Sequence, residues 1–113
     1  MANDLKLVNM TTQDFASAKD AELFDVGWEK MGKEYYPLLR KGGMIKHSVL
    51  KVWNKISEHR YVQIFEYESK ESFENCQKIW KKIENELFQG LLVKMVSDKG
   101  LVVSETDLND IID

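Results

Sequence analysis

The stretch that most constrains the fold is residues 44–87, in which two strand-like segments lead directly into an amphipathic helix. The segments 44–53 and 61–68 are rich in β-branched and aromatic side chains, and a polar turn at 57–60 separates them. Because so few residues join them, the natural connection is an antiparallel hairpin. Ser69 then provides a weak N-cap for the helix that follows.

An apolar stripe with helical spacing defines one side of that helix. Side chains three or four positions apart form the stripe: Phe73, Cys76, Trp80, Ile83 and Leu87. The single cysteine, Cys76, has no partner for an intramolecular disulfide, and its place on the apolar side is typical of a small core residue. Residues 91–96 fit either helix or strand, and we favour helix, because a turn signal at 98–100 and a strand-like segment at 100–105 follow them.

The chain before the hairpin is expected to supply one strand and one helix. Residues 5–11 are predicted to form the strand and residues 12–20 a polar loop. Ser17 and Asp20 are both candidates for the helix cap at the end of that loop.

The first helix is predicted over residues 20–41. Its apolar stripe comprises Phe24, Trp28, Met31, Tyr35 and Leu38. We expect this stripe to pack on a sheet; the alternative is that it forms the wall of a cofactor site. Pro37 indicates a kink or an end near Tyr36, and Gly42-Gly43 is a firm stop.

The element order is therefore β-α-β-β-α-β. This pattern is typical of the α+β ferredoxin-like fold, in which a four-stranded antiparallel sheet carries both helices on one face. At 113 residues, without a Gly/Ser-rich linker or internal repeat, we expect residues 1–113 to form a single domain.

Composition argues against several classes of partner. The formal net charge is -3 and the basic residues are scattered, so we expect no nucleic-acid partner. We also expect no membrane association and a cytoplasmic location, since no signal peptide or long apolar run is present. Neither a metal-ligand cluster nor a cofactor fingerprint is recognised, so we expect no metal and no cofactor.

The hairpin predicts an additional interface. Alternation places Tyr61, Gln63, Phe65 and Tyr67 on one side of their strand, and large apolar groups occur on both sides of the hairpin. One layer of helices cannot cover both sheet faces. An exposed face that includes Phe65, Tyr67 and Trp53 would favour a two-fold homodimer in which a second sheet covers the first.

The segment VQIFEYESKESFENC, residues 62–76, resembles the dimeric α/β-barrel superfamily, in particular NIPSNAP-like proteins and antibiotic biosynthesis monooxygenases. In these families a strand ends in an aromatic residue followed by Glu-Ser and an acidic helix start. The resemblance implies two ferredoxin-like protomers whose sheets form a barrel with a cavity. It does not imply one chemistry, because the superfamily supports several.

The haem-degrading branch of the superfamily can be tested residue by residue. Its pattern combines an asparagine in the first strand, which Asn9 could match, with a tryptophan at the end of the third strand, where this chain has Tyr67. It also needs a histidine on the following helix, and residues 70–96 contain none. Haem degradation is therefore not expected.

Candidate site residues come from the predicted strands. His47 is the best candidate for a general base, because its ordinary pKa near ~6.5 suits proton transfer at neutral pH. The alternative is a strand histidine that only hydrogen-bonds to a neighbour. The predicted ligand-binding residues are Asn9, Trp53, Gln63, Phe65 and Tyr67.

Three functions stay open at this point. The first is the binding of a small apolar or aromatic molecule in the barrel cavity. The second is a cofactor-independent monooxygenase, or a related enzyme, that uses His47 as its base. The third is a structural or interaction module without a ligand.

Overall fold

The computed structural model describes residues 5–55, 59–87 and 93–112, and its centre is an antiparallel sheet. The strands, in the sheet order β2-β3-β1-β4, are β1 (Leu7–Phe15), β2 (Met44–Lys51), β3 (His59–Tyr67) and β4 (Val93–Leu101). The helices are α1 (Ala18–Gly42), α2 (Lys70–Asn75), α3 (Gln77–Leu87) and a short 3-10 helix, η2 (Leu108–Asp110). The predicted α+β, ferredoxin-like fold is confirmed.

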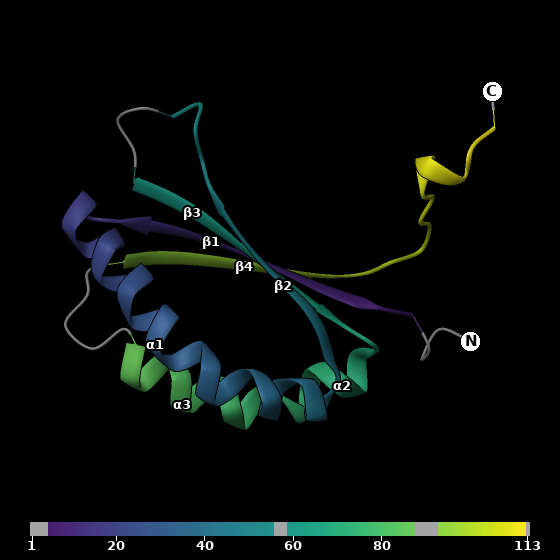
Figure 1. The fold of residues 1–113 in the computed structure, drawn as a ribbon, viewed down its shortest axis with the longest axis horizontal. Coiled ribbons are helices and arrows are strands. Elements are labelled where there is room, and N and C mark those ends of the chain that lie inside the picture. The colour runs from purple at the N-terminus through teal and green to yellow at the C-terminus, as the bar shows by residue number, and fades with distance from the viewer. Residues whose placement is uncertain (1–4, 56–58, 88–92, 113) are drawn as a thin grey trace.

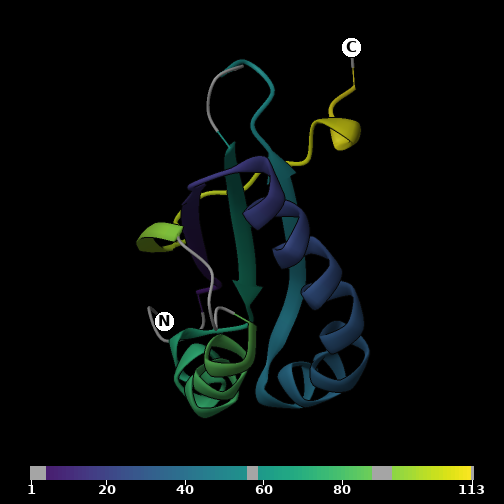
Figure 2. The same ribbon diagram turned by 90° about the vertical axis from the view of Figure 1, so that its left-hand side faces the viewer.

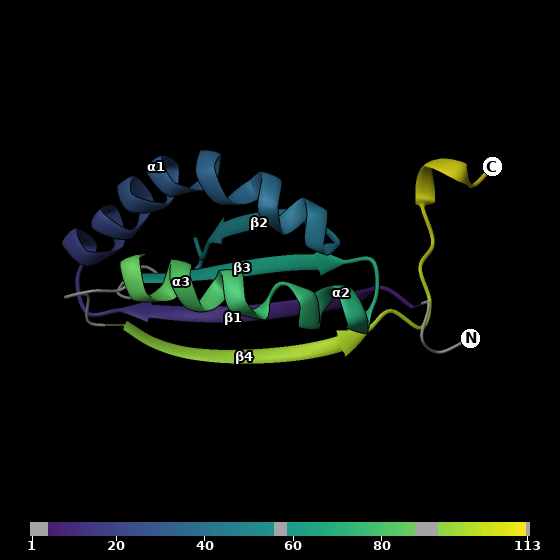
Figure 3. The same cartoon turned by 90° about the horizontal axis from the view of Figure 1, so that it is seen from below.

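All three α-helices lie on the same side of the sheet (Figures 1 and 3). Figure 2 views α2 and α3 nearly end on and shows α1 beside them. We call the side of the sheet under these helices the helix face and the opposite side the outer face. In the part of the chain that the structure describes, no helix has the length and apolar character needed to span a membrane.

Local signals set the helix ends as predicted. The Ser17 side chain caps α1 by accepting a hydrogen bond from the backbone N–H of Asp20, and Ser69 caps α2 in the same way through Ser72. At the other end of α1, Gly43 adopts a left-handed conformation with φ of 113° and donates its N–H to the last carbonyls of the helix.

Two features of α1 differ from the prediction. The helix continues through Pro37 to Gly42 and does not end near Tyr36. Leu38 is exposed, whereas Leu39 is fully buried. The inward position falls four residues after Tyr35, not three, because a helix has 3.6 residues per turn.

Strands β1 and β4 differ most from the prediction. The loop expected over 12–20 is wrong for residues 12–15, which extend β1 to Phe15. The helix expected to continue to residue 96 is wrong for residues 93–96, which begin β4, while residues 91 and 92 lie outside the described part. Of the strand expected at 100–105, Gly100 and Leu101 belong to β4. Pairing of β1 with β4 along its whole length decides these assignments, since residues 12–15 could be loop or strand locally and residues 93–96 helix or strand.

The second predicted helix and the hairpin also change in detail. The helix is divided at Cys76 into α2 and α3. Of the turn expected at 57–60, His59 and Arg60 belong to β3, and residues 57 and 58 lie outside the described part. Cys76 itself is fully buried, as predicted for a core residue.

The predicted aromatic surface is wrong, because the set that contains Phe65 and Tyr67 lies on the helix face. Phe65 is 8% exposed and Tyr67 is 0% exposed. The stripes of α1 and α3 cover this face, and the sequence alone did not fix which strand set they would cover. Trp53, 88% exposed, lies beyond the end of β2.

The core forms at the two ends of the helix face. At one end Leu7, Tyr67 and Met44 are paired across three strands and pack with Leu39 and Cys76. At the other end Phe15 packs on Phe24 and Tyr61, with ring centroids 5.3 and 5.9 Å apart. Between these clusters the sheet carries the buried Phe65 and three buried polar side chains: Thr11, Gln13 and Gln63.

The cap of α1 generates a stability prediction. A Cβ added at Gly43 would collide with the Ser72 side chain, and the left-handed backbone disfavours any L side chain. We expect Gly43→Ala to lower the free energy of unfolding by roughly 1–3 kcal/mol, measured by urea denaturation. Gly100→Ala is the control, because its added Cβ would meet nothing within 4 Å. Equal losses in the two variants would contradict this account.

Candidate ligand-binding site

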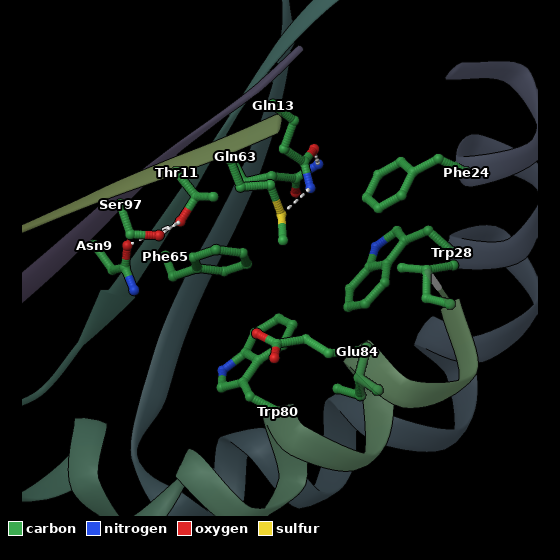
Figure 4. Close-up of a pocket in the computed structure, with 13 residues that line it drawn as sticks. Asn9, Thr11, Gln13, Phe24, Trp28, Gln63, Phe65, Trp80, Glu84 and Ser97 are labelled. Carbon is green, nitrogen blue, oxygen red and sulfur yellow. Dashed lines mark hydrogen bonds between the residues drawn. The ribbon is translucent and has the colours of Figure 1, made fainter. Parts of the chain in front are cut away.

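A cavity of about 100 Å³ lies between the middle of the helix face and the helices α1 and α3 (Figure 4). Its lining residues come from five elements: Asn9, Thr11, Gln13, Phe24, Trp28, Gln63, Phe65, Trp80, Ile83, Glu84, Leu87, Met95 and Ser97. The cavity therefore occupies the region between the two apolar clusters, where the sheet carries polar side chains.

The helices and Phe65 form an aromatic wall. Trp28 of α1 and Trp80 of α3 are nearly parallel, with ring centroids 5.8 Å apart and an interplanar angle of 9°. Phe65 lies edge-on to Trp80 at 4.6 Å. Such surfaces bind flat aromatic rings well, because stacking adds to the burial of apolar area.

The sheet forms a polar wall, in which each buried amide has a hydrogen-bond partner. The Gln63 Nε2 atom donates to Gln13 Oε1 at 3.1 Å, and Gln13 Nε2 contacts Met95 Sδ at 3.7 Å. Gln13 and Gln63 are 3% and 2% exposed, so unpaired amides here would cost free energy.

His47 extends this chain of hydrogen bonds toward the surface. Its Nε2 atom lies 2.5 Å from Gln63 Oε1, and its Nδ1 atom lies 2.6 Å from the Tyr36 hydroxyl oxygen. The Tyr36 oxygen in turn accepts a hydrogen bond of 2.9 Å from Trp28 Nε1. The chain thus runs from Trp28 on the aromatic wall, through His47, back to the polar wall.

Burial lowers the pKa of His47, with the hydrogen bond to Gln63 acting in the opposite direction. The imidazole is stacked on Phe65 at 4.6 Å and lies edge-on to Trp28 at 5.1 Å. These neighbours exclude water and therefore disfavour the charged imidazolium. Burial therefore favours the neutral imidazole of His47.

A second group of polar side chains lies at the β4 side of the cavity. The Thr11 hydroxyl donates to Asn9 Oδ1 at 3.1 Å and lies 2.8 Å from the Ser97 hydroxyl (Figure 4). Because one hydroxyl hydrogen serves only one acceptor, Ser97 donates to Thr11.

Three of the predicted ligand-binding residues line the cavity together: Asn9, Gln63 and Phe65. His47 lies behind Gln63, and both of its ring nitrogens are already in hydrogen bonds. Trp53 and Tyr67 lie elsewhere: Trp53 is exposed, and the buried Tyr67 hydroxyl accepts a hydrogen bond from Trp80 Nε1 at 2.7 Å.

The sequence interpretation missed most of both walls. The residues concerned are Thr11, Gln13, Trp80, Met95 and Ser97, whereas Trp28 belongs to the stripe for which a cofactor wall was the alternative. For β1 a signal was present, because every second residue from 7 to 15 lies on one face. This set has an apolar side chain at each end, Leu7 and Phe15, and three polar ones between them: Asn9, Thr11 and Gln13. Ending the strand at residue 11 hid that pattern.

The arrangement suits a small, flat molecule without formal charge. Among the described residues that line the cavity, Glu84 has the one charged side chain, and Glu84 is exposed. In the described ranges, no group of three or more His, Cys, Asp or Glu side chains is placed to hold a metal ion.

The chain is similar to several solved structures. A dimeric ferredoxin-like protein from an uncultured marine organism is 33% identical, with a TM-score of 0.79 over 90% of this chain and 98% of that chain. A NIPSNAP-like domain protein from Burkholderia xenovorans is 21% identical (TM-score 0.64, covering 92% of this chain and 90% of its own). These similarities confirm the predicted resemblance.

An enzyme is also among the structures with this fold. SnoaB, a cofactor-independent oxygenase from Streptomyces nogalater, is 16% identical, with a TM-score of 0.64 over 94% of this chain and 99% of that chain. At this identity the similarity shows the fold alone. No curated protein matches the chain.

A family model supplies the assignment at the level of sequence. It is described as a domain of unknown function (DUF6974), and it matches residues 4–102, which include all the strands and α-helices around the cavity. The chain belongs to this family, DUF6974.

Proposed function

We propose that this protein binds a small, flat, largely aromatic molecule in the cavity between the helix face and the helices α1 and α3. The observation that carries the proposal is the pairing of an aromatic wall with a buried polar wall around a cavity. Ligand sites typically combine apolar walls with a few oriented polar groups in this way.

Filling the cavity tests the proposal. Ser97 is exposed and lines the cavity, so Ser97→Phe should occupy the space without disturbing the core. We expect at least one bicyclic aromatic compound among indene, indole and indanone to bind the wild-type protein, and Ser97→Phe to weaken its binding about tenfold or more. NMR titration of the backbone and side-chain amides gives the affinity and the site.

Lys81→Phe is the matched control, because it adds the same ring to an exposed position of α3 that does not line the cavity. This variant should bind the compound like the wild type. Failure of all three compounds to bind, or equal binding by Ser97→Phe, would contradict the proposal.

We further propose that the protein is a homodimer in which the outer face packs on a second copy. Apolar side chains gather there across all four strands: Met10, Leu50, Val62, Ile64 and Val96. Met10, Leu50 and Val96 are 46%, 44% and 57% exposed, and such a patch is typical of an interface. The 33% identical relative is described as dimeric.

The C-terminal segment supports the same arrangement. Lys6 pairs with Glu105 at 2.8 Å, and beyond this point the chain rises on the side of the outer face (Figure 1). Leu108, Ile111 and Ile112 of this segment are 74%, 57% and 94% exposed. A second sheet on the outer face would bring a partner within reach of these side chains. Two sheets packed in this way would form the predicted α/β barrel.

A charge on the outer face should separate the protomers. Met10→Glu would bury an unpaired carboxylate in the interface, so we expect the dimer dissociation constant to rise about a hundredfold or more, measured by sedimentation. Leu23→Glu is the control, because Leu23 is similarly exposed but lies on α1. A wild-type protein that sediments as a monomer would refute the homodimer.

The other functions predicted from the sequence stay predictions. A monooxygenase that uses His47 would need Gln63 to move aside, because Gln63 separates the imidazole from the cavity. An interaction module without a ligand would leave the polar wall without a role. The cytoplasmic location and the lack of nucleic-acid or membrane partners also stay predictions.

The lowered pKa of His47 makes stability depend on pH. The unfolded chain has the ordinary histidine pKa of about 6.5 and so binds a proton more readily than the folded chain. The contribution of His47 to stability is therefore complete above that pH and falls as the pH drops below it. We expect wild type to lose more stability than His47→Gln between about pH 7.5 and about pH 5 in urea denaturation. Equal losses in both would show that His47 is not responsible.

A further inference from the structure

We infer that the polar wall selects ligands that accept hydrogen bonds, in particular aromatic compounds with a carbonyl oxygen, over ligands that only donate them. This inference rests on the proposed binding function and specifies the chemistry of the ligand. It follows from the direction of the hydrogen bonds in the chain from Trp28 to Met95.

The two ends of that chain have fixed roles. The indole N–H of Trp28 can only donate, and the thioether sulfur of Met95 can only accept. Met95 Sδ must therefore face the amide nitrogen of Gln13, which leaves Gln13 Oε1 directed at Gln63. Gln63 must then present its own nitrogen to that oxygen.

The same logic fixes the remaining links. Because the Gln63 amide nitrogen donates to Gln13, the Gln63 carbonyl oxygen is directed at His47 Nε2, which must carry the hydrogen. Neutral His47 then accepts at Nδ1 from the Tyr36 hydroxyl, whose oxygen accepts from Trp28. Every link agrees with both ends, so the chain has a single direction.

This direction determines what the wall offers a ligand. Both amide oxygens already accept hydrogen bonds, from His47 and Gln63, at 2.5 and 3.1 Å. Each amide nitrogen has two hydrogens, and the chain uses one of each. The contact from Gln13 to the Met95 sulfur, at 3.7 Å, is also weak and easily exchanged for a bond to oxygen.

In Figure 4 the amides of Gln13 and Gln63 lie across the cavity from Phe24 and Trp28. The donors thus face a space whose other wall is aromatic. A flat ring between the walls could direct a carbonyl oxygen at the Gln13 amide nitrogen, whereas a ring N–H directed at the same nitrogen would meet another donor.

Three bicyclic compounds of nearly equal size test the inference: indanone has a carbonyl acceptor, indole has an N–H donor, and indene has neither. We expect indanone to bind about tenfold more tightly than indole or indene, the effect of one hydrogen bond in a buried site. NMR titration should show the side-chain amide signals of Gln13 shifting with indanone.

Gln13→Leu should remove the preference for indanone over indene, because it removes the donor and keeps a similar volume. Gln77→Leu is the matched control, since the Gln77 amide bonds to the Phe73 carbonyl and does not line the cavity. This variant should keep the preference.

The outcomes separate the two proposals. If indole binds as tightly as indanone, or if Gln13→Leu keeps the preference, the inference fails while binding in the cavity stands. If none of the three compounds binds, the proposed function fails and the inference fails with it.

Discussion

The structure depends on the need to hydrogen-bond two amides that are buried in the middle of a sheet. Gln13 and Gln63 are neighbours across β1 and β3 and have almost no contact with water. Apolar side chains from α1 and α3 could not satisfy them, so their hydrogen-bond partners come from the sheet itself. His47 of β2 and Met95 of β4 provide partners from the two edge strands of the sheet. The cavity lies beside this network.

Local signals in the sequence were sufficient for most of the architecture. Ser17, Ser69 and Gly43 mark helix ends through short-range hydrogen bonds and backbone conformation, and these features do not depend on the rest of the fold. Strand β4 is different. Residues 93–96 suit a helix or a strand equally well, and only pairing with β1 decides between them. Long-range pairing of this kind leaves no signature within a window of a few residues.

The candidate site was less predictable than the fold for the same reason. Alternation separated Gln63 and Phe65 from their neighbours on β3, but it could not indicate which face the helices cover. The set could therefore be read either as an exposed interface or as a pocket wall, and the structure buries it. Trp28 and Trp80 belong to regular apolar stripes, which usually form core. Their role around a cavity follows from the polar strand residues opposite them, and these become visible only once β1 reaches Phe15.

The division of the core into two end clusters has a consequence for how this fold can be altered. Leu7, Tyr67 and Leu39 hold one end of the sheet to the helices, and Phe15 and Phe24 hold the other. The polar side chains of the middle contribute little apolar burial, so they can be redesigned while the apolar core keeps the frame in place. A new set of side chains at the central positions of β1, β3 and β4 would give the same scaffold a different selectivity. The arrangement is therefore well suited to diversification, because these polar positions are separate from the apolar side chains that supply most of the burial.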